Sequence, residues 1–279
     1  MSFNTQEQRV DYLARELCKD SIKYKDLCIE NLDKRILMRS LMNIRMPKPM
    51  SNEFLKIQDE FLKRECIEKG ITRLDDIPNI RERYGVNSKY ADKISIWKGD
   101  ITTLKVDAIV NAANSQMLGC FIPGHNCIDN AIHSAAGIQL RDECNKYMLR
   151  KKEKDKYYKE QTGQAMITKA YNLPSNYVIH TVGPIVTGSL TEYLREELAL
   201  CYKSCLNIAI KNNIKSIAFC CISTGEFHFP NKEAAKISIN TVKSFLNKKD
   251  NFEKIDRIIF NVFKGYDHEI YKKLLLSKL

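Results

Sequence analysis

The sequence predicts an α/β protein that carries a helical segment at its amino end. From residue 93 onward, short runs rich in β-branched residues alternate with longer stretches of helical periodicity. That alternation is typical of a sheet covered by helices on both faces. The chain has 279 residues, of which 44% are hydrophobic and 28% charged. Such a composition excludes a disordered or low-complexity protein and permits a sizeable core.

The first 90 residues are expected to form a helical extension. Apolar residues share a helix face, at i, i+3 and i+7 spacing, in two stretches: Val10, Leu13 and Leu17, and Phe54, Ile57 and Phe61. Between them, two prolines in residues 46–51 end one helix, and Ser51 or Asn52 can cap the next. No chemical motif appears there. We therefore divide the chain into a helical extension, 1–90, and a main domain, 91–279.

The main domain is expected to hold six strands and four helical stretches. The strands are predicted at 94–100, 106–113, 164–171, 177–182, 216–222 and 257–263. The helical patterns lie near 128–150, 191–212, 231–247 and 267–278.

The net charge and the targeting signals indicate which partners and which cellular location to expect. There are 45 basic and 34 acidic side chains, which leave a net charge of +11. Basic residues gather in residues 146–159, either as a solvated helix end or as a surface that attracts an anionic partner. Nucleic-acid binding is not expected, because stacking aromatics and a reader motif are missing. Without a signal peptide or an apolar run of about 20 residues, the protein is expected to be cytoplasmic and away from membranes.

Ten cysteines are many for a reducing compartment, where clustered thiols favour metal binding or catalysis over disulfides. Eight lie among apolar residues or without metal-ligand neighbours and are expected to be ordinary thiols: Cys18, Cys28, Cys66, Cys144, Cys201, Cys205, Cys220 and Cys221. Cys120 and Cys127 differ, because a histidine lies between them.

Polar residues follow three predicted strands, where open α/β sheets place their ligands. Asp100 ends one strand, and Asn111 and Asn114 end the next; each could also be an ordinary turn or cap residue. After the fifth strand, the small residues of the loop 221–230 allow backbone amides to face a phosphate or pyrophosphate.

The strongest chemical signal lies in residues 118–137. Cys120, His125 and Cys127 form the pattern C-x4-H-x-C. Thiolates with an imidazole suit Zn²⁺, and three ligands without a fourth leave a coordination position open, as in catalytic zinc sites. Two stray thiols beside a loop histidine are the alternative. His133 shares a helix face with Asp129 and is expected to be a satisfied structural histidine.

The order of these motifs resembles the macrodomain family, which binds ADP-ribose. GDIT at 99–102, VNAAN at 110–114, the ligand loop, IHSAAG at 132–137 and STGEF at 223–227 carry the resemblance. With cysteine and histidine in place of the usual glycine-rich loop, the chain is similar to the zinc-dependent branch, the microbial protein-ADP-ribose hydrolases. Their amino-terminal helical extension also matches. The resemblance implies a three-layer α/β/α fold around a mixed six-stranded sheet.

The resemblance also implies a role for each matching residue. Asp100 and Ile101 would hold the adenine, with Asn261 and Phe263 lining its side. Asn114 would contact the distal ribose. The diphosphate would be wrapped by backbone amides of Ser223, Thr224, Gly225, Glu226 and Phe227, with Phe227 beside the distal ribose. Cys120, His125 and Cys127 would bind one zinc ion, and Asp129 would orient or deprotonate water.

We therefore predict a zinc-dependent hydrolase that removes mono-ADP-ribose from modified protein side chains. Zinc would either orient the ribose and leaving group or lower the pKa of a bound water. A non-catalytic ADP-ribose reader with a structural zinc and a basic nucleic-acid-binding module are the alternatives. The resemblance further associates this branch with a cognate ADP-ribosyltransferase and a lipoyl-carrier substrate.

Overall fold

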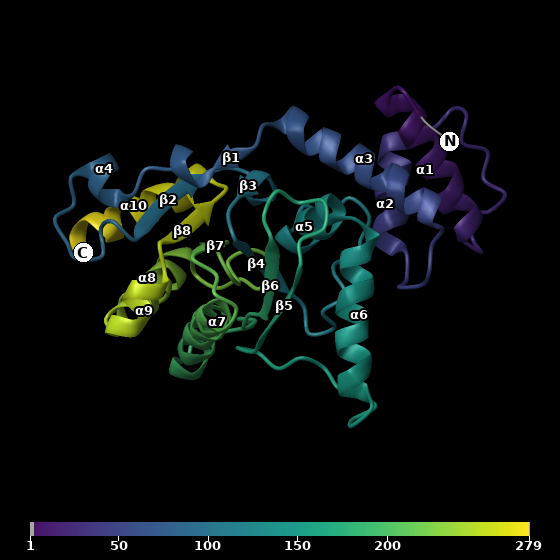
Figure 1. Cartoon of the computed structure of the whole chain (residues 1–279). Coiled ribbons are helices and arrows are strands. Elements are labelled where there is room, and N and C mark those ends of the chain that lie inside the picture. The colour runs from purple at the N-terminus through teal and green to yellow at the C-terminus, as the bar shows by residue number, and fades with distance from the viewer. Residues whose placement is uncertain (1–2, 279) are drawn as a thin grey trace.

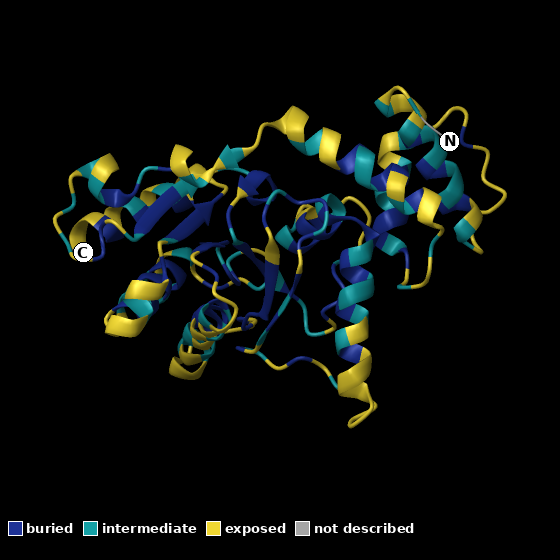
Figure 2. Cartoon of the chain, viewed as in Figure 1, coloured by how far each residue is buried: buried dark blue, intermediate teal, exposed yellow. Residues whose placement is uncertain are grey.

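A computed structural model describes residues 3–278. Three helices at the amino end lie on one side of the molecule, and the carboxyl end lies on the opposite side, beyond the sheet (Figure 1). Dark blue strands in the centre and yellow outer turns of the helices show that the core follows the sheet (Figure 2). Within the described residues, no helix combines the length and the apolar character that crossing a bilayer requires.

The helical extension consists of α1 (Gln6–Asp20), α2 (Lys34–Ile44) and α3 (Asn52–Lys69). Ser51 caps α3 by accepting a hydrogen bond from Phe54 N, which confirms one of the two predicted caps. The apolar faces of the three helices meet in a cluster of their own, in which Phe54 and Phe61 are fully buried. From the main domain, Ile138 joins this cluster.

A short connection leads from the extension into the main domain. It contains β1 (Thr72–Arg73), a 3₁₀ turn at Leu74–Asp76 and α4 (Ile80–Tyr84). β1 pairs in parallel with β3 (Leu104–Lys105), a small second sheet that we did not predict. Ile77 and Ile80 lie in the main hydrophobic cluster. The division of the chain at residue 90 stays a prediction.

The main sheet has six strands in the order β2-β8-β7-β4-β6-β5. Its strands are β2 (Ile94–Lys98), β4 (Ala108–Ala113), β5 (Ala165–Lys169), β6 (Tyr177–Val182), β7 (Ser216–Phe219) and β8 (Arg257–Val262). β5 runs antiparallel to β6, and the other neighbours are parallel. The predicted mixed six-stranded sheet is therefore confirmed.

Helices cover both faces of this sheet. They are α5 (Ile128–Ala136), α6 (Ile138–Lys152), α7 (Glu192–Lys211), α8 (Asn231–Leu246), α9 (Lys249–Lys254) and α10 (Gly265–Lys278). α7, α8 and α10 pack side by side in a row, with α7 against β5 and β6 and α10 against β2 and β8. α5 packs on β4, and α6 packs on β5 next to the extension (Figure 1). The arrangement is the predicted α/β/α fold.

Two details differ from the sequence-based expectations. The single helix predicted near 128–150 is wrong, because Gly137, at φ 97° and ψ 171°, ends α5 and begins α6. That backbone region is open almost only to glycine. α9 was not predicted, because its six residues are too short to show a helical period.

Candidate functional site

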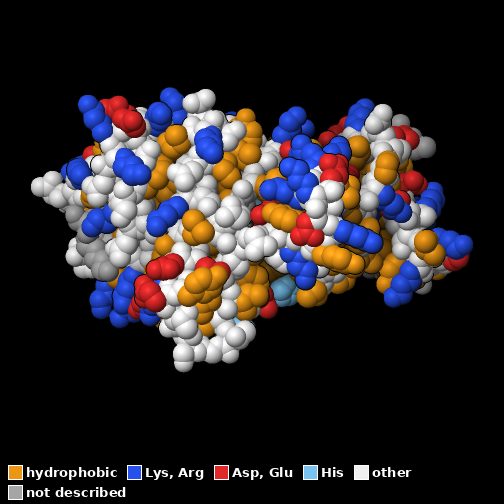
Figure 3. Space-filling model, turned by 90° about the horizontal axis from the view of Figure 1, so that it is seen from below, with side chains coloured by type: hydrophobic (Ala, Val, Ile, Leu, Met, Phe, Trp, Pro, Cys, Tyr) orange, Lys and Arg blue, Asp and Glu red, His pale blue; other side chains and the backbone are white. Residues whose placement is uncertain are grey.

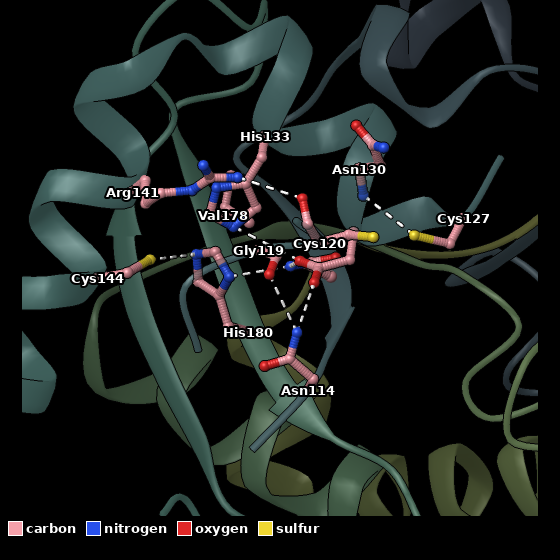
Figure 4. A network of polar contacts seen from close by, with 12 residues as sticks. Asn114, Gly119, Cys120, Cys127, Asn130, His133, Arg141, Cys144, Val178 and His180 are labelled. Atoms are coloured by element: carbon pink, nitrogen blue, oxygen red, sulfur yellow. Dashed lines mark hydrogen bonds and ion pairs between the residues drawn. The ribbon is translucent and has the colours of Figure 1, made fainter. Parts of the chain in front are cut away.

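The predicted metal ligands come together in the loop that joins β4 to α5. The ligand atoms of Cys120, His125 and Cys127 all lie within 4.8 Å of one another. Cys120 Sγ is 3.5 Å from His125 Nδ1, and the two sulfur atoms face each other (Figure 4). Cys127 also caps α5, since its Sγ accepts a hydrogen bond of 3.4 Å from Asn130 N. The start of α5 thereby holds one ligand in place.

The donor set suits a soft divalent cation. Two thiols and one imidazole match the preferences of Zn²⁺. All three side chains are partly exposed, so an ion can reach them. Burial raises the pKa of the Cys127 thiol to about 12. A bound cation would offset that cost, because metal binding replaces the thiol proton.

His125 also links the loop of residues 119–127, called the metal-ligand loop below, to the loop that follows β7. Its Nε2 lies 3.5 Å from Glu226 Oε1, while its Nδ1 faces Cys120. A carboxylate on the second ring nitrogen fixes the tautomer and the orientation of a metal-bound histidine. The Glu226 carboxylate therefore contacts a predicted metal ligand, a role that was not expected from the sequence.

The 221–230 loop folds as a tight backbone turn after β7. Ser223 has a φ of 65°, and its carbonyl accepts a hydrogen bond of 2.9 Å from Phe229 N. The amides of Gly225, Glu226 and Phe227 find no acceptor within the described part of the chain. Such amides are available to an anion. The Ser223 hydroxyl is buried and has no hydrogen-bond partner within the described residues. It lies so close to Gly183 that a Cβ at that position would clash with it.

Asn114 and Asp129 belong to one buried polar network. Asn114 Nδ2 donates to Gly119 O at 3.1 Å and to Asp129 Oδ2 at 3.4 Å (Figure 4). Asn111 Nδ2 donates to Asp129 Oδ1 at 2.8 Å. Burial raises the pKa of Asp129 to about 6, although the hydrogen bond from Asn111 opposes the rise. Because Asp129 is only 5% exposed, its carboxylate reaches the site through Asn114.

Two histidines lie beneath this network. His180 is fully buried; its Nδ1 lies 3.1 Å from Asn111 Nδ2 and its Nε2 lies 2.9 Å from Thr168 Oγ1. Together with Cys144 and His133 it forms a second group of possible metal ligands. Both ring nitrogens of His180 already have partners, so the arrangement fits a structural hydrogen-bond chain.

His133 only partly matches its prediction. It shares a helix face with Asp129, whose Oδ1 lies 3.5 Å from His133 Nε2, as expected. However, neither ring nitrogen forms a hydrogen bond within the described residues, so the expectation of a satisfied histidine is wrong. The ring instead supports Gly119, where an added Cβ would lie 2.8 Å from His133 Cγ. Burial lowers the pKa of His133 and keeps the ring neutral.

The residues assigned to the adenine lie at the ends of β2 and β8. Asp100 Oδ1 accepts hydrogen bonds from Thr102 N and Oγ1, at 3.0 and 2.7 Å, which positions the buried Ile101 in the following turn. Asn261 is buried and donates to Gly99 O at 3.0 Å, so it supports this turn from β8. Phe263 is 76% exposed. Its exposed ring is free to stack on a base.

Apart from Cys144, which belongs to the second group of possible metal ligands, the remaining cysteines and the basic segment show no further site within the described residues. All eight thiols that we expected to be ordinary are free, and five of them are buried: Cys18, Cys144, Cys201, Cys205 and Cys220. Near the lower end of α6, Lys and Arg side chains mix with acidic and apolar ones (Figure 3).

Two residues that contact the metal-ligand loop were not expected from the sequence. Asn43 lies at the end of α2, and Arg141 lies in α6. Both are buried polar side chains, at 3% and 5% exposure. Their only signal in the sequence is a polar residue within an apolar helix pattern, which does not reveal its partner.

Comparisons with known proteins agree with this geometry. The Macro domain family model matches residues 110–238. A protein from Treponema medium named protein-ADP-ribose hydrolase is 47% identical over 273 residues, covering 97% of this chain and 99% of that protein. One of the same name from Staphylococcus aureus (strain MRSA252) is 44% identical over 238 residues, covering 85% and 83%. The solved structure of the Trypanosoma brucei macrodomain in complex with ADP-ribose is similar at a TM-score of 0.63, with 28% identity and coverage of 82% and 93%.

Proposed function

The chain belongs to the Macro domain family, and from this premise we propose that it removes ADP-ribose from modified protein side chains by hydrolysis. Relatives named protein-ADP-ribose hydrolase match over most of their length and of this chain. We propose in addition that the reaction uses one zinc ion per chain, held by Cys120, His125 and Cys127.

One observation carries the proposal: the 221–230 loop, which is distant in the sequence, and Asn114, which follows β4, both contact the loop that carries the predicted metal ligands. Glu226 of the 221–230 loop reaches His125, and Asn114 after β4 donates to Gly119, next to Cys120. A diphosphate on the free amides of the loop would therefore place the adjoining ribose beside the metal ligands and Asn114. The scissile bond leaves that ribose at its anomeric carbon.

The residues of the chain act mainly by holding the ribose in one orientation. Asn114 would bind the distal ribose, while Asp129 and Asn111 fix the amide of Asn114 from below. Such positioning can contribute about 100-fold to the rate. Burial of Asp129 favours this orienting role over direct contact with water. Zinc, when bound, would supply Lewis acidity, either for ribose and leaving group or for water.

The test compares Cys127→Ala with Cys28→Ala, which removes an exposed, free thiol from the extension. Zinc content, melting temperature and release of ADP-ribose from a modified protein are measured for both. We expect Cys127→Ala to stay folded, to lose zinc and to lose most of its turnover, while Cys28→Ala matches the parent. The main core is large enough to fold without the metal.

Three outcomes would contradict the proposal. A Cys127→Ala protein that is folded and nearly as fast as the parent would exclude a catalytic zinc. One that unfolds at assay temperature would assign the zinc a structural role. A parent that binds ADP-ribose without releasing it from protein would favour a reader. The transferase and lipoyl-carrier partners and the cytoplasmic location stay predictions.

A further inference from the structure

We propose that the helical extension holds the metal-ligand loop in its ligating conformation, and that Asn43 is the positioning residue through which it does so. This inference rests on the metal site of the proposed function, and it assigns the helical extension a role in shaping that site. The loop consists of residues 119–127, between β4 and α5.

The loop has little structure of its own. Ile122, Pro123, Gly124 and Asn126 are exposed. One hydrogen bond inside it joins backbone to backbone, from His125 N to Ile122 O at 3.3 Å, and Ile122 N donates to Cys120 Sγ at 3.5 Å. Cys120 Sγ also lies 3.5 Å from His125 Nδ1. Three such contacts, each worth about 1 kcal/mol, do not hold nine residues in one conformation. The ligating arrangement therefore depends on contacts from outside the loop.

Asn43 supplies a first set of these contacts. Its Oδ1 accepts a hydrogen bond of 3.3 Å from Gly124 N, at the tip of the loop. Its Nδ2 donates to Asn130 Oδ1 at 2.6 Å and to Ser134 Oγ at 3.0 Å, both on α5. The side chain is 3% exposed, so these bonds are shielded from water. One amide on α2 thus joins the loop tip to the helix that follows the loop.

Asn130 relays this contact to the ligands. With its Oδ1 engaged by Asn43, its Nδ2 points the other way and donates to Ile122 O at 3.0 Å. The Asn130 backbone N–H donates to Cys127 Sγ (Figure 4). Because Ile122 lies between Cys120 and His125, the chain from Asn43 through Asn130 reaches both sides of the ligand set.

Arg141 fastens the other end of the loop to the same helix end. Its Nη1 donates to the carbonyl oxygens that close α2, those of Met42, Asn43 and Arg45, at 3.1, 2.8 and 2.6 Å. Its Nη2 donates to Cys120 O at 3.3 Å, and its guanidinium lies 4.3 Å from the centre of the Phe121 ring. The carboxyl end of α2 and the backbone of Cys120 are therefore held by one buried cation.

Gln58 provides a matched control, because it is another buried amide between the extension and the main domain. It donates to Gln139 Oε1 at 2.7 Å and accepts from Ile138 N at 3.1 Å, both at the start of α6. None of its hydrogen bonds within the described residues reaches the metal-ligand loop. Gln58→Ala should therefore weaken the packing of the extension without changing the loop directly.

The experiment uses the full-length chain with the variants Asn43→Ala, Gln58→Ala, Asn130→Ala and the double variant Asn43→Ala with Asn130→Ala. Amide hydrogen exchange of residues 119–127 is followed in metal-free protein, and the zinc affinity is measured by competition with a chelator. Melting temperatures show that each variant is folded.

We expect faster exchange in the loop and roughly 10-fold weaker zinc binding in Asn43→Ala, the lower end of the range for residues that orient ligands. Gln58→Ala should leave the loop exchange and the zinc affinity near the parent values, even if its melting temperature falls as much as that of Asn43→Ala. The double variant should bind zinc about as weakly as Asn130→Ala alone, because both residues act through one chain.

Equal loop exchange in Asn43→Ala and the parent would overturn the inference, and this result requires no metal. So would equal effects of Asn43→Ala and Gln58→Ala on zinc affinity, which would reduce Asn43 to a packing residue. A parent that binds no zinc would instead contradict the metal site of the proposed function, while the exchange data would still test the role of Asn43.

Discussion

Among single residues, Glu226 has a position that its backbone role does not explain. Its side chain is 66% exposed, yet its carboxylate lies beside His125 Nε2. A contact of this kind usually orients a metal-bound imidazole, and an exposed one acts at the lower end of the known range. Glu226 therefore joins the two functional loops through a side chain as well as through an amide.

We predict that Glu226→Gln weakens zinc binding by about 5- to 10-fold, because a neutral amide holds the His125 N–H less strongly than a carboxylate does. Chelator competition measures the change. Glu192→Gln, which alters an exposed glutamate on α7 away from the site, should bind zinc as the parent does. If Glu226→Gln binds zinc as tightly as the parent does, the Glu226 side chain has no role in metal binding.

His180 makes the folded state sensitive to acid. Burial lowers its pKa to about 3, from 6.5 in an unfolded chain. Between pH 3 and pH 6.5 His180 is protonated in the unfolded chain but not in the folded chain. The free energy of unfolding therefore falls as the pH falls below 6.5. At pH 5 the loss amounts to about 2 kcal/mol relative to pH 8.

Urea unfolding at pH 8 and pH 5 tests this prediction against His180→Gln, which does not titrate in this range. The parent should lose about 2 kcal/mol more stability between the two pH values than the variant does. His133 is present in both proteins, but His180 contributes to the lowering of its pKa, so the difference reports His180 together with its effect on His133. An equal loss in both would mean that His180 is protonated in the folded protein.

At the scale of elements, the junction of α5 and α6 determines what the site can contain. α5 begins directly after its cap, the predicted ligand Cys127, and carries Asp129 and Asn130 in its first turn, whereas α6 carries Arg141. The turn at Gly137 redirects the chain so that both helices face the loop. One continuous helix over these residues would carry Arg141 away from Cys120.

Gly137→Ala is expected to destabilise the protein by about 1–3 kcal/mol, because only glycine adopts its backbone conformation without strain. The added Cβ would also lie 2.7 Å from Gln58 Nε2. Gly188→Ala is the control, since its Cβ meets nothing within 4 Å and its φ is not positive. Thermal or urea unfolding should separate the two variants; equal stabilities would show that the junction tolerates a side chain.

For the whole molecule, the distribution of the core determines how metal and fold depend on each other. The main cluster runs through the sheet and its helices, and the second cluster lies within the extension. The predicted metal ligands lie outside both clusters, in the loop between β4 and α5. Folding should therefore depend on the metal only weakly.

We predict that the protein stripped with a chelator still melts in a cooperative transition, lowered by no more than mass action on the metal requires. Hydrolysis should disappear with the metal and return when Zn²⁺ is added back. Circular dichroism and an ADP-ribose release assay follow the two properties on one sample. Loss of the melting transition together with the metal would instead make the ion part of the folding core.

The sequence by itself determined the α/β class, the six strands and the local ligand pattern. Strand and helix periods are written in short stretches of chain, and the spacing of Cys120, His125 and Cys127 lies within eight residues. For the same reason the sequence limits the cap of α3 to Ser51 or Asn52, of which Ser51 is the residue that caps it. Local signals of this kind need no knowledge of partners distant in the sequence.

Only the tertiary structure decided which distant residues serve the site. Asn43, Arg141 and His180 reach it from three separate elements, and the side chain of Glu226, of which only the backbone amide was predicted to serve the site, reaches it from the 221–230 loop. A buried amide or guanidinium looks the same in a sequence whatever accepts its hydrogen bonds. The turn at Gly137 was missed because helical periodicity continues across it, while the positive φ arises from packing. The hydrogen-bond partner of a buried polar group depends on the folded chain, because only the fold determines which acceptor lies next to it.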